Sequence, residues 1–503
     1  MQKKLKTIDE LSEIIADLKE QGRKVVLCHG VFELIHPGHL YHFEEAKEQG
    51  DVLVVSITAD EFINKGPDRP IFPEIVRAKA LASLEVIDFV VINPETAAIE
   101  LLKKLKPDIY FKGQEYEKGL KDPNRNLFKE AEAIRSKGGE IMFSHSPVFS
   151  STKFLKNYFD LYPAEVKKFL EDFKFQSSDL IEGLKSLKGM KVLLIGETII
   201  DEYNYCKGMA KTPKDNIVAT KFINKEVFAG GILACANHLA GFCSEVHICT
   251  ALGSENSYYD FIKTKLKPNV KAKFFYDKQG QTIVKKRFID PTFFTKMFEA
   301  YYFDDRELAE ETKKEIIEYL DEKIKDYDLV IVHDYGHGFF DKNLIEFICQ
   351  KAKFLAVNTQ TNSANLGFNV ITKYSNADYV CIDEPEARLA VRMRDNDISE
   401  VVKEVFKQAK PKNLIVTRGH LGCLALKDGK ILKFPVLSTK LVDRMGAGDA
   451  FFAVTSACMA KGMPIEAVAF IGNAVGALKV TIVGNKSSVE YYPLYKFIQN
   501  LLK

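Results

Sequence analysis

Two histidines, His36 and His39, have a type and spacing suited to phosphate chemistry. They close the sequence CHGVFELIHPGH, residues 28–39, in which an apolar run at 25–27 is followed by Gly30. This pattern predicts a strand, a tight turn and a helix start. Side chains three positions apart share one helix face, and the free N–H groups at a helix N-terminus attract anions. The pair therefore predicts a triphosphate site; the alternative is two ordinary surface histidines.

A second anion site is predicted at three hydroxyl residues, Ser150, Ser151 and Thr152. They precede an apolar run of helical period that carries two lysines, PVFSSTKFLK. Hydroxyls and N–H groups at a helix start bind anions, although a simple helix N-cap gives the same pattern. Together with the histidines, they would hold the two ends of a nucleoside triphosphate. This arrangement suits nucleotidyl transfer, in which a substrate phosphate attacks the α-phosphorus and pyrophosphate leaves.

A third candidate site lies in the sequence DRMGAGD at 443–449. Gly446, Ala447 and Gly448 open an apolar helix, so their N–H groups are predicted to form a pocket for a phosphoryl group in transfer. Asp449 stands at the helix start, where a carboxylate can accept the proton of an attacking hydroxyl. Taken alone, G-A-G-D also fits a glycine-rich turn. The T-x-G-x-x-G sequence at 417–422 and Asp443 favour the phosphoryl-transfer interpretation.

Weaker polar features stand upstream of this third site. A predicted strand at 191–196 is followed by Asp201, and Gly230-Gly231 begins an apolar helical run. Both features suit contacts to a small polar ligand, although paired glycines mostly mark turns. Later strand ends carry polar side chains as well, at Asn358 and at Asp383 with Glu386.

The elements that must position these residues alternate between strand and helix. Strands are predicted at 24–30, 51–58, 87–92 and 108–112, and the alternation resumes after residue 190. Such a pattern predicts two α/β domains with doubly wound parallel sheets, whose sites lie at the carboxyl ends of the strands. Charged helical sequence between them predicts domains at 1–160 and 190–503 with a helical connector at 161–189. Residues 271–289 break the alternation and are predicted to form antiparallel strands of a lid or dimer-forming flap.

Composition excludes several classes of partner. The 71 lysines and arginines nearly balance 69 aspartates and glutamates in 503 residues, which argues against a nucleic-acid or anionic-membrane surface. The sequence has no apolar run long enough to span a membrane and no recognisable signal peptide. Nine scattered cysteines without a C-x-x-C pair predict buried thiols in a reducing, cytoplasmic compartment. A zinc site among residues 235–249 is the disfavoured alternative to ordinary packing.

The N-terminal motifs resemble those of a known family. VFELIHPGH is similar to the H-x-G-H signature of cytidylyltransferase-like nucleotidyltransferases, and FSST to their second signature. Residues 22–158 resemble the nucleotidyltransferase half of the bifunctional heptose-phosphate kinase/adenylyltransferases. The resemblance implies a Rossmann-like fold in which His36 and His39 act on the phosphates. It further implies nucleotide and phosphate contacts from Gly30, Phe32, Lys47, Arg77, Lys112, Ser150, Ser151 and Thr152.

The C-terminal motifs resemble the ribokinase-like (PfkB) sugar kinases across residues 190–503, with DRMGAGD as the most specific match. The resemblance implies a ribokinase-like fold with a small antiparallel β lid and Asp449 as general base. Gly446, Ala447 and Gly448 would be the anion hole, and Glu386 would support Mg²⁺ through water. The other implied contacts are Asn358, Thr417, Gly419 and Gly422 to ATP, and Asp201, Gly230 and Gly231 to the sugar.

The chain departs from these families at three places. The heptose enzymes carry the kinase half first, whereas here it comes second. An N-x-x-E motif appears as Asp383 to Glu386, and an aspartate-proline-lysine strand end appears as Asn358-Thr359-Gln360. The second and third departures bear on metal and nucleotide-phosphate binding in the kinase half.

The combined expectation is a bifunctional enzyme that works with ATP and Mg²⁺. It would phosphorylate a sugar phosphate of the heptose type and convert a sugar 1-phosphate to an NDP-sugar, of the ADP-heptose type, with release of pyrophosphate. One alternative is a CTP-dependent cytidylyltransferase for an alditol phosphate or another sugar phosphate. The other is an active nucleotidyltransferase fused to a non-catalytic sugar-binding or dimerisation module. The expected partners are small molecules and further copies of the chain, through the lid, with no nucleic acid or membrane.

Overall fold

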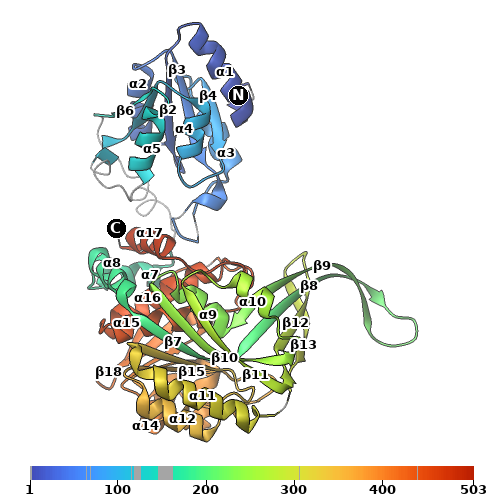
Figure 1. Cartoon of the computed structure of the whole chain (residues 1–503). Helices are drawn as coiled ribbons and strands as arrows, with labels where there is room; N and C mark the ends of the chain where they lie inside the picture. The colour runs from blue at the N-terminus through green and yellow to red at the C-terminus, as the bar shows by residue number, and fades with distance from the viewer. Residues whose placement is uncertain are drawn as a thin grey trace. The chain divides into compact units, whose positions relative to one another are not determined.

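The computed structural model describes residues 3–63, 65–67, 69–114, 116–117, 126–145, 162–304, 306–438 and 440–502. The chain divides into two compact units, Met1–Leu161 and Tyr162–Lys503, which are taken in turn below (Figure 1). The sheet topologies confirm the prediction of two α/β units built on doubly wound parallel sheets. Ser150, Ser151 and Thr152 lie outside the described residues.

Unit 1 is built on a six-stranded parallel sheet in the order β1-β4-β3-β2-β5-β6. The strand order reverses between β2 and β5, so their carboxyl ends mark the switch point at which such sheets bind ligands. The described elements are β1 (Leu5–Lys6), α1 (Ile8–Glu20), β2 (Val25–Gly30), α2 (Pro37–Lys47), β3 (Val52–Thr58), η1 (Asp60–Phe62), α3 (Glu74–Ala82), β4 (Phe89–Asn93), α4 (Ile99–Leu105), β5 (Ile109–Lys112), α5 (Asn126–Arg135) and β6 (Glu140–Phe143).

Helices cover both faces of the unit 1 sheet. Side chains of α2 and α3, among them Phe43 and Leu81, pack on one face against Val26 and Val55. Helices α1, α4 and α5 pack on the other face. Because both faces are buried, the strands are apolar at nearly every position, as β3 is in VLVVSIT.

Unit 2 contains a nine-stranded sheet in the order β11-β10-β7-β14-β15-β16-β17-β18-β19. The first seven strands of this order are parallel, and β18 and β19 are antiparallel. The strand order reverses between β7 and β14. The strands are β7 (Lys191–Gly196), β10 (Glu245–Glu255), β11 (Val270–Gln281), β14 (Leu329–Asp334), β15 (Leu355–Thr359), β16 (Tyr379–Asp383), β17 (Asn413–Thr417), β18 (Cys423–Lys427) and β19 (Lys430–Phe434).

Two layers of helices enclose this sheet. Alternate residues of β7 show the division, since Val192 and Leu194 contact one layer and Leu193 and Ile195 the other. The first layer holds α7 (Ala164–Asp172), α8 (Ser177–Ser186), η3 (Leu187–Gly189), α9 (Ile232–Leu239), α10 (Tyr259–Lys265), α15 (Ala447–Ala460), α16 (Ile465–Lys479) and α17 (Tyr491–Leu501). The second holds α11 (Glu310–Lys323), η4 (Ile324–Asp326), α12 (Lys342–Lys351), η5 (Ile371–Lys373), α13 (Glu384–Val391) and α14 (Ile398–Ala409), and η6 (Gly419–Leu421) follows β17.

The stretch predicted as a connector belongs to unit 2 where it is described. Helix α8 and the turn after it bury Leu180, Leu184 and Leu187 in the same core as the large sheet, and Val166 of α7 joins them. The amphipathic pattern that suggested a connector therefore arises from packing against this core. No described helix is long and apolar enough to cross a membrane.

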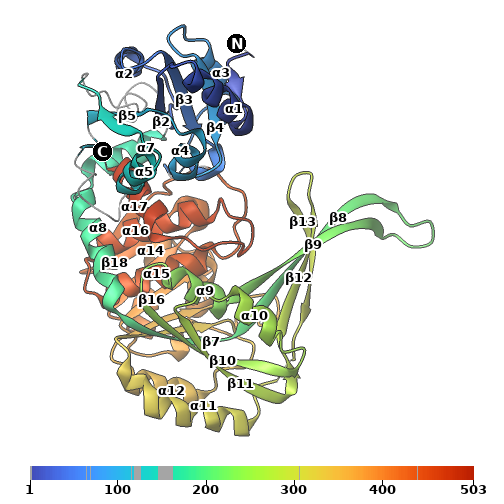
Figure 2. The same ribbon diagram turned by 45° about the horizontal axis from the view of Figure 1, so that its top comes forward.

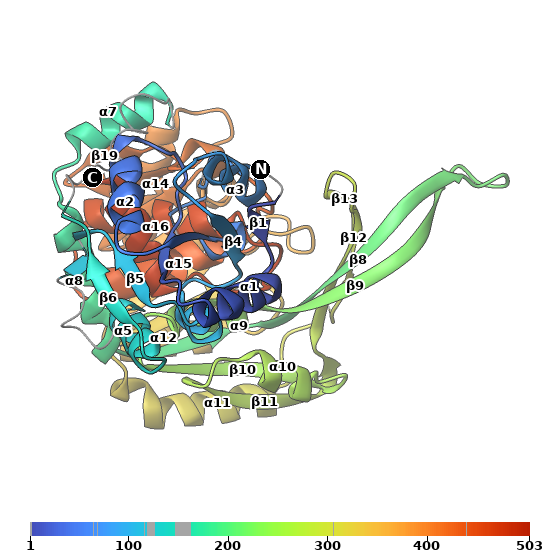
Figure 3. The same ribbon diagram turned by 90° about the horizontal axis from the view of Figure 1, so that it is seen from above.

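A second sheet of unit 2, here called the lid sheet, has the order β13-β12-β8-β9. Its strands are β8 (Thr198–Lys211), β9 (Val218–Gly231), β12 (Ile283–Asp290) and β13 (Thr295–Tyr302). The long β8–β9 hairpin projects away from the rest of the unit (Figures 2 and 3).

The predicted lid segment, residues 271–289, is divided between the two sheets. Strand β11 joins the edge of the large sheet parallel to β10, and β12 enters the lid sheet parallel to β8. The predicted antiparallel pairing holds for β12 with β13, whereas β12 with β8 and β11 with β10 are parallel, so the lid sheet is mixed. Periodicity marked these residues as strands, but the partner of a strand is set by residues far away in the sequence.

Two candidate active sites

The first candidate site lies at the start of α2. His36 is the N-cap of this helix, and its backbone carbonyl accepts a hydrogen bond from the His39 N–H at 2.8 Å. The two imidazole rings stack with their centroids 3.8 Å apart and their planes at 17°. The structure therefore brings the predicted pair together at the helix N-terminus, after the carboxyl end of β2 and beside the switch point.

The turn between β2 and α2 explains how Gly30 and Phe32 belong to this site. Phe32 has a φ of 44°, in the left-handed region, and its ring meets His39 edge-on at 5.2 Å. A Cβ at Gly30 would stand 3.1 Å from that ring. A residue without a side chain therefore lets Phe32 fold back over the strand end and support His39.

Burial keeps both histidines neutral. It lowers the pKa of His36, and it lowers the pKa of His39 to about 3 with further help from the charges of His36, His42 and Lys65. The Nδ1 atom of His39 is buried and has no hydrogen-bond partner among the described residues. Two buried imidazoles at a helix N-terminus can donate to an anion, because a phosphate would stabilise their protonated forms.

Of the three predicted cations, only Lys112 lies at the switch point. It ends β5, is nearly buried, and its Nζ donates to the His29 carbonyl at 3.2 Å. Lys47 ends α2 and pairs with Asp88 at 2.5 Å while donating to the Asp51 carbonyl, just before β3 begins. Lys47 therefore lies at the amino edge of the sheet, and the structure does not bring it to the histidines.

Arg77 is buried and fully engaged by the protein. Its guanidinium donates to the carbonyls of Val31 and Thr58 and to the Asp60 carboxylate at 2.6–2.8 Å, and its Nε to the Phe72 carbonyl. These bonds tie the loop after β2 to the end of β3. Arg77 therefore positions the loop after β2, whereas the resemblance in sequence implied a direct contact with phosphate.

His42 is a neighbour of the first site that the sequence analysis did not single out. It continues the i, i+3 spacing of His36 and His39, and its ring lies 5.2 Å from that of Phe111 on β5. Burial lowers its pKa to about 4. The HxxHxxH spacing was the signal that could have found it.

The second candidate site lies at the start of α15 in unit 2. Gly446 caps this helix with a φ of 72°, a conformation that favours glycine. Asp449 follows in the first turn and reaches His333 of β14, next to the switch between β7 and β14. The glycine turn at 446–448, here called the anion-binding turn, lies at the carboxyl edge of the sheet; its Ala447 N–H donates to the Arg444 carbonyl at 3.3 Å, and the first turn of α15 leaves further N–H groups for a ligand.

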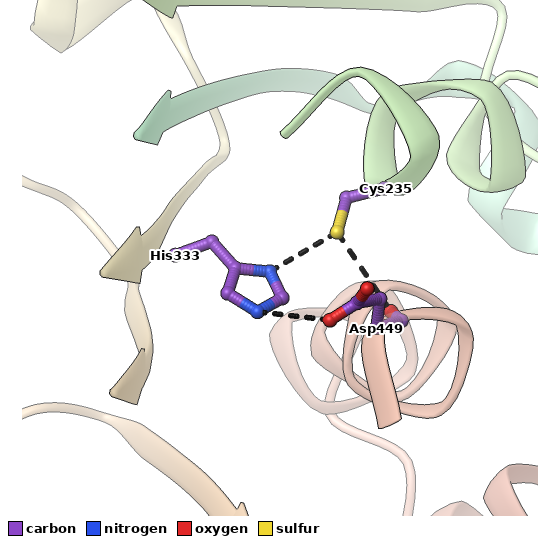
Figure 4. A group of neighbouring side chains, drawn as sticks. All are labelled: Cys235, His333 and Asp449. Carbon is purple, nitrogen blue, oxygen red and sulfur yellow. Dashed lines mark hydrogen bonds and ion pairs between the residues drawn. The ribbon is translucent and has the colours of Figure 1, made fainter. Parts of the chain in front are cut away.

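Asp449 is held by a chain of hydrogen bonds that spans three elements (Figure 4). His333 Nε2 lies 3.2 Å from Asp449 Oδ1, and His333 Nδ1 lies 3.0 Å from the Sγ of Cys235 on α9. Burial raises the pKa of Cys235 well above its ordinary value, which keeps the hydrogen on sulfur. The Sγ also lies 4.0 Å from the backbone carbonyl of Asp449, and the imidazole directs its Nε2–H to the Asp449 carboxylate.

This chain also sets the charge of Asp449. Burial raises the pKa of the carboxyl, but the hydrogen bond from His333 outweighs it, with help from the charge of Lys479, so the pKa lies below its ordinary value. The same three side chains could be suspected of holding a metal. Because His333 uses one nitrogen for each neighbour, the group is instead a hydrogen-bond relay that positions Asp449.

Replacing His333 should shift the acid limb of the pH–rate profile of any reaction that needs Asp449 as a base. His333→Leu removes the donor, so the Asp449 pKa should rise and the limb should shift to higher pH. His333→Gln keeps an N–H near the Nε2 position and should shift it less. The measurement is the pH profile of kcat/KM for both variants. Identical profiles for Leu and Gln would show that the hydrogen bond does not tune Asp449.

Asp443 fastens the anion-binding turn to the lid sheet. Its carboxylate, which is fully buried, accepts hydrogen bonds from Tyr203 of β8 at 2.8 Å and from Lys296 of β13 at 2.7 Å. Burial raises its pKa, but the hydrogen bonds from Lys296, Gly484 and Tyr203 outweigh this, so the pKa lies below its ordinary value. Asp443, the first aspartate of DRMGAGD, therefore has its own hydrogen-bond partners, separate from those of Asp449.

Asp201 lies on β8 in a cluster of polar side chains. Arg287 of β12 forms an ion pair with its Oδ1, and the Asn485 amide approaches Oδ2 at 3.4 Å. A Cβ at Gly230 would stand 2.1 Å from Asp201 Oδ2. Gly230 therefore makes room for the carboxylate, and Gly231, with a φ of 56°, begins α9 beside it.

Gly230→Ala should disturb this cluster while Gly208→Ala, also in the lid sheet, should not. The added methyl must displace Asp201, so we expect a loss of about 1–3 kcal/mol in the free energy of unfolding. A Cβ at Gly208 meets nothing within 4 Å, so its variant should stay within about 0.5 kcal/mol of the parent. Urea unfolding of both variants is the measurement. Equal behaviour of the two variants would contradict the role of Gly230.

The residues predicted to contact ATP lie at the ends of neighbouring strands. Asn358 is the next-to-last residue of β15 and donates to the Cys381 carbonyl of β16 at 2.7 Å. Thr417 ends β17 opposite Asp383, and Gly419 and Gly422 shape the tight turn that follows. The structure therefore gathers Asn358, Thr417 and this turn along one edge of the sheet.

Glu386 forms a buried acidic pair with Asp383. Each carboxylate accepts the backbone N–H of the other residue at 2.8 Å, in a capping box at the start of α13. Burial and the charge of Asp383 raise the pKa of Glu386. The hydroxyl of Thr361, whose N–H donates to Glu386, is buried without a hydrogen-bond partner among the described residues. Paired carboxylates beside such a hydroxyl fit a divalent cation held through water.

Comparisons with known families agree with the division into two sites. Residues 190–490 match the family model described as pfkB family carbohydrate kinase, and residues 27–157 match the model described as Cytidylyltransferase-like. The first match spans both the anion-binding turn and His333. The second spans His36, His39 and Lys112.

Two relatives and two solved structures extend these matches. Bifunctional protein HldE of a Nitratiruptor species is 42% identical over 132 residues, 26% of this chain and 28% of the relative. Bifunctional protein HldE of Desulfatibacillum aliphaticivorans is 35% identical over 159 residues, 31% of each chain. The chain thus matches less than a third of either relative's length.

The solved structures are of phosphofructokinase-2 from Escherichia coli. The complex with fructose-6-phosphate is 13% identical with a TM-score of 0.51, and the complex with substrates and products is 15% identical with a TM-score of 0.50. Each alignment covers 62% of this chain and 100% of the other. At this identity the likeness concerns the fold of unit 2.

Proposed function

The chain belongs to the pfkB family of carbohydrate kinases, and from this premise we propose that unit 2 transfers the γ-phosphoryl group of ATP to a sugar hydroxyl. The observation that carries the proposal is Asp449, a carboxylate only 15% exposed and held by His333 at the start of α15. A lowered pKa keeps it ionised at neutral pH, so it can accept the hydroxyl proton as the oxygen attacks phosphorus and ADP leaves. The anion-binding turn would stabilise the phosphoryl group in transfer.

The supporting contacts follow from the strand ends of unit 2. ATP would lie along Asn358, Thr417 and the turn of Gly419 and Gly422, and the sugar would lie toward Asp201 and the Gly230-Gly231 turn. Glu386, with Asp383 beside it, would hold Mg²⁺ through water, and the ion would neutralise charge on the phosphates of ATP. The acidic pair stands in place of the amide of an N-x-x-E motif and would supply two carboxylates to the cation.

For unit 1 we propose nucleotidyl transfer to a sugar phosphate. A phosphate oxygen of the sugar 1-phosphate would attack the α-phosphorus of a nucleoside triphosphate, and pyrophosphate would leave. His36 and His39 support this through their stacked position at the start of α2 and the buried Nδ1 of His39, which has no partner in the described part of the chain. Ser150, Ser151 and Thr152 would complete the triphosphate site. A heptose phosphate with ATP as donor is our leading substrate pair, by resemblance of the motifs, and CTP with another sugar or alditol phosphate is the alternative.

A non-catalytic unit 2 is the second candidate, and one observation favours it. The amide of Asn358 donates a hydrogen bond to the Cys381 carbonyl. At this position the family usually has an aspartate-proline-lysine strand end. Unit 2 would then bind sugar or join two copies without turnover.

The β8–β9 hairpin supports a homo-oligomer through the lid sheet. It projects from unit 2 (Figure 3) and carries five exposed apolar side chains, Met209, Ile217, Val218, Phe222 and Ile223. Apolar side chains gathered on a projecting hairpin favour contact with another chain, and we propose a second copy of this protein as the partner.

Two assays of the full chain test the proposed function. The first measures ADP formation from ATP with a panel of sugar phosphates, and the second measures pyrophosphate release from ATP and from CTP with sugar 1-phosphates. Activity in both assays supports the bifunctional enzyme, and the preferred triphosphate decides between the donors. Pyrophosphate release without ADP formation from any sugar would favour the non-catalytic unit 2.

A further inference from the structure

We propose that Lys479 is a positioning residue for the phosphoryl transfer of unit 2, acting as a built-in cation behind the anion-binding turn. The inference rests on the proposed kinase function and names a residue that neither motif includes. Lys479 ends α16, and its side chain is fully buried. A buried lysine is rare unless its charge is satisfied, so its partners indicate its role.

The ammonium group joins two loops that meet under the anion-binding turn. Its Nζ donates to the carbonyls of Met445 and Gly484, at 2.7 Å each. Met445 directly precedes Gly446, and a Cβ at Gly446 would stand 3.5 Å from the Nζ. The positive charge therefore lies next to the N–H groups proposed to receive the phosphoryl group.

Asp443 binds the same two residues from the opposite side. Its carboxylate accepts the N–H of Gly484 at 2.8 Å and the N–H of Met445 at 3.2 Å, while Lys479 holds their carbonyls. The backbone N–H and the carbonyl of Met445 and of Gly484 are thus both held by charged side chains. This two-sided attachment sets the backbone before Gly446, and hence the direction of the N–H groups that follow.

The charges around Lys479 come from several elements. Burial lowers its pKa to about 8, partly offset by Asp443 of the preceding loop, Asp449 of α15 and Asp201 of β8. Lys296 of β13 lowers it further, and burial together with the charge of Lys479 lowers the pKa of His238 on α9. Lys479 therefore carries a proton at neutral pH but loses it within the range of an ordinary activity assay.

Removing the side chain should leave a site for a small cation. Two carbonyl oxygens converge on the position of the Nζ, and the charges of Asp443, Asp449 and Asp201 favour a cation there, a setting that suits ammonium or potassium. The full chain with Lys479→Ala should lose about 10²-fold in kinase kcat in tetramethylammonium buffer. Ammonium or potassium should restore about tenfold or more by re-forming these contacts, whereas the parent protein should change by less than about twofold between the same salts.

Two controls separate a positioning role from a general loss of structure. Lys461→Ala removes an exposed lysine after α15 and should keep the kinase kcat and its indifference to salt. Nucleotidyl transfer by unit 1 should be unchanged in Lys479→Ala. A readout without catalysis is the Tm of unit 2, which ammonium or potassium should raise in Lys479→Ala but not in the parent or in Lys461→Ala.

The pH profile gives an independent test. In the parent protein the kinase kcat should fall as pH rises through about 8, because the deprotonated amine no longer supplies the charge. In Lys479→Ala with saturating potassium this alkaline limb should be absent, since potassium does not titrate. A merely structural side chain would leave the limb in place.

Each result decides the inference. A Lys479→Ala protein with nearly parental kcat, or one whose kcat and Tm ignore ammonium and potassium, would overturn it. If the parent phosphorylates no sugar, the proposed kinase function fails, and the Tm response to these ions then decides alone whether Lys479 occupies a cation position. An active parent with an unaffected variant would overturn only the role of Lys479.

Discussion

Asp449→Asn should lower the kinase kcat by about 10³–10⁴-fold, because the amide cannot accept the hydroxyl proton. The substitution keeps the size of the side chain, and asparagine can still accept the hydrogen bond from His333 Nε2. The sugar and ATP should therefore bind with nearly unchanged KM, so the loss should appear in kcat. Steady-state ADP formation with the preferred sugar phosphate measures both.

Two comparisons make this result specific. Asp428→Asn changes an exposed aspartate in the turn between β18 and β19 and should leave kinase activity unchanged. Pyrophosphate release by unit 1 should be the same in Asp449→Asn and the parent. Loss of both activities in Asp449→Asn would contradict two separate sites, and retention of kinase activity would exclude Asp449 as the base.

His39→Ala should reduce nucleotidyl transfer by about 10²–10³-fold, since it removes a donor proposed to neutralise charge on the triphosphate in the transition state. His36→Ala should act similarly. His36 is the N-cap of α2 but makes no side-chain capping bond, so its removal should cost little helix stability. The loss should therefore be seen in the rate of pyrophosphate release and not in the Tm.

The matched control in unit 1 is His145→Ala. His145 is exposed and engages Glu45 through its backbone N–H, so the variant should release pyrophosphate at the parental rate. Both His36→Ala and His39→Ala should keep full kinase activity. Nearly parental pyrophosphate release by both variants would show that the histidines are only a packed pair.

Local motifs allowed much of the two sites to be predicted. His36 and His39 are three residues apart, and the anion-binding turn and Asp449 are consecutive, so one helix start positions each group. The alternation of strands and helices likewise predicted the two parallel sheets, because the hydrophobic periodicity of a helix and the apolar run of a buried strand can be read from neighbouring residues. Predictions failed where a residue type fitted but its position did not, as for Lys47 at the far edge of the sheet.

The sequence by itself determined the chemistry of each helix start: paired imidazoles in unit 1, and a glycine turn with a carboxylate in unit 2. Only the tertiary structure decided what surrounds them. Cys235 and His333 are 98 residues apart and meet Asp449 through three separate elements. Lys479 likewise reaches Met445 over 34 residues. Such contacts depend on the order of the strands and on how the helices pack, and both result from many weak interactions across the whole unit. A local pattern of residues therefore cannot predict them.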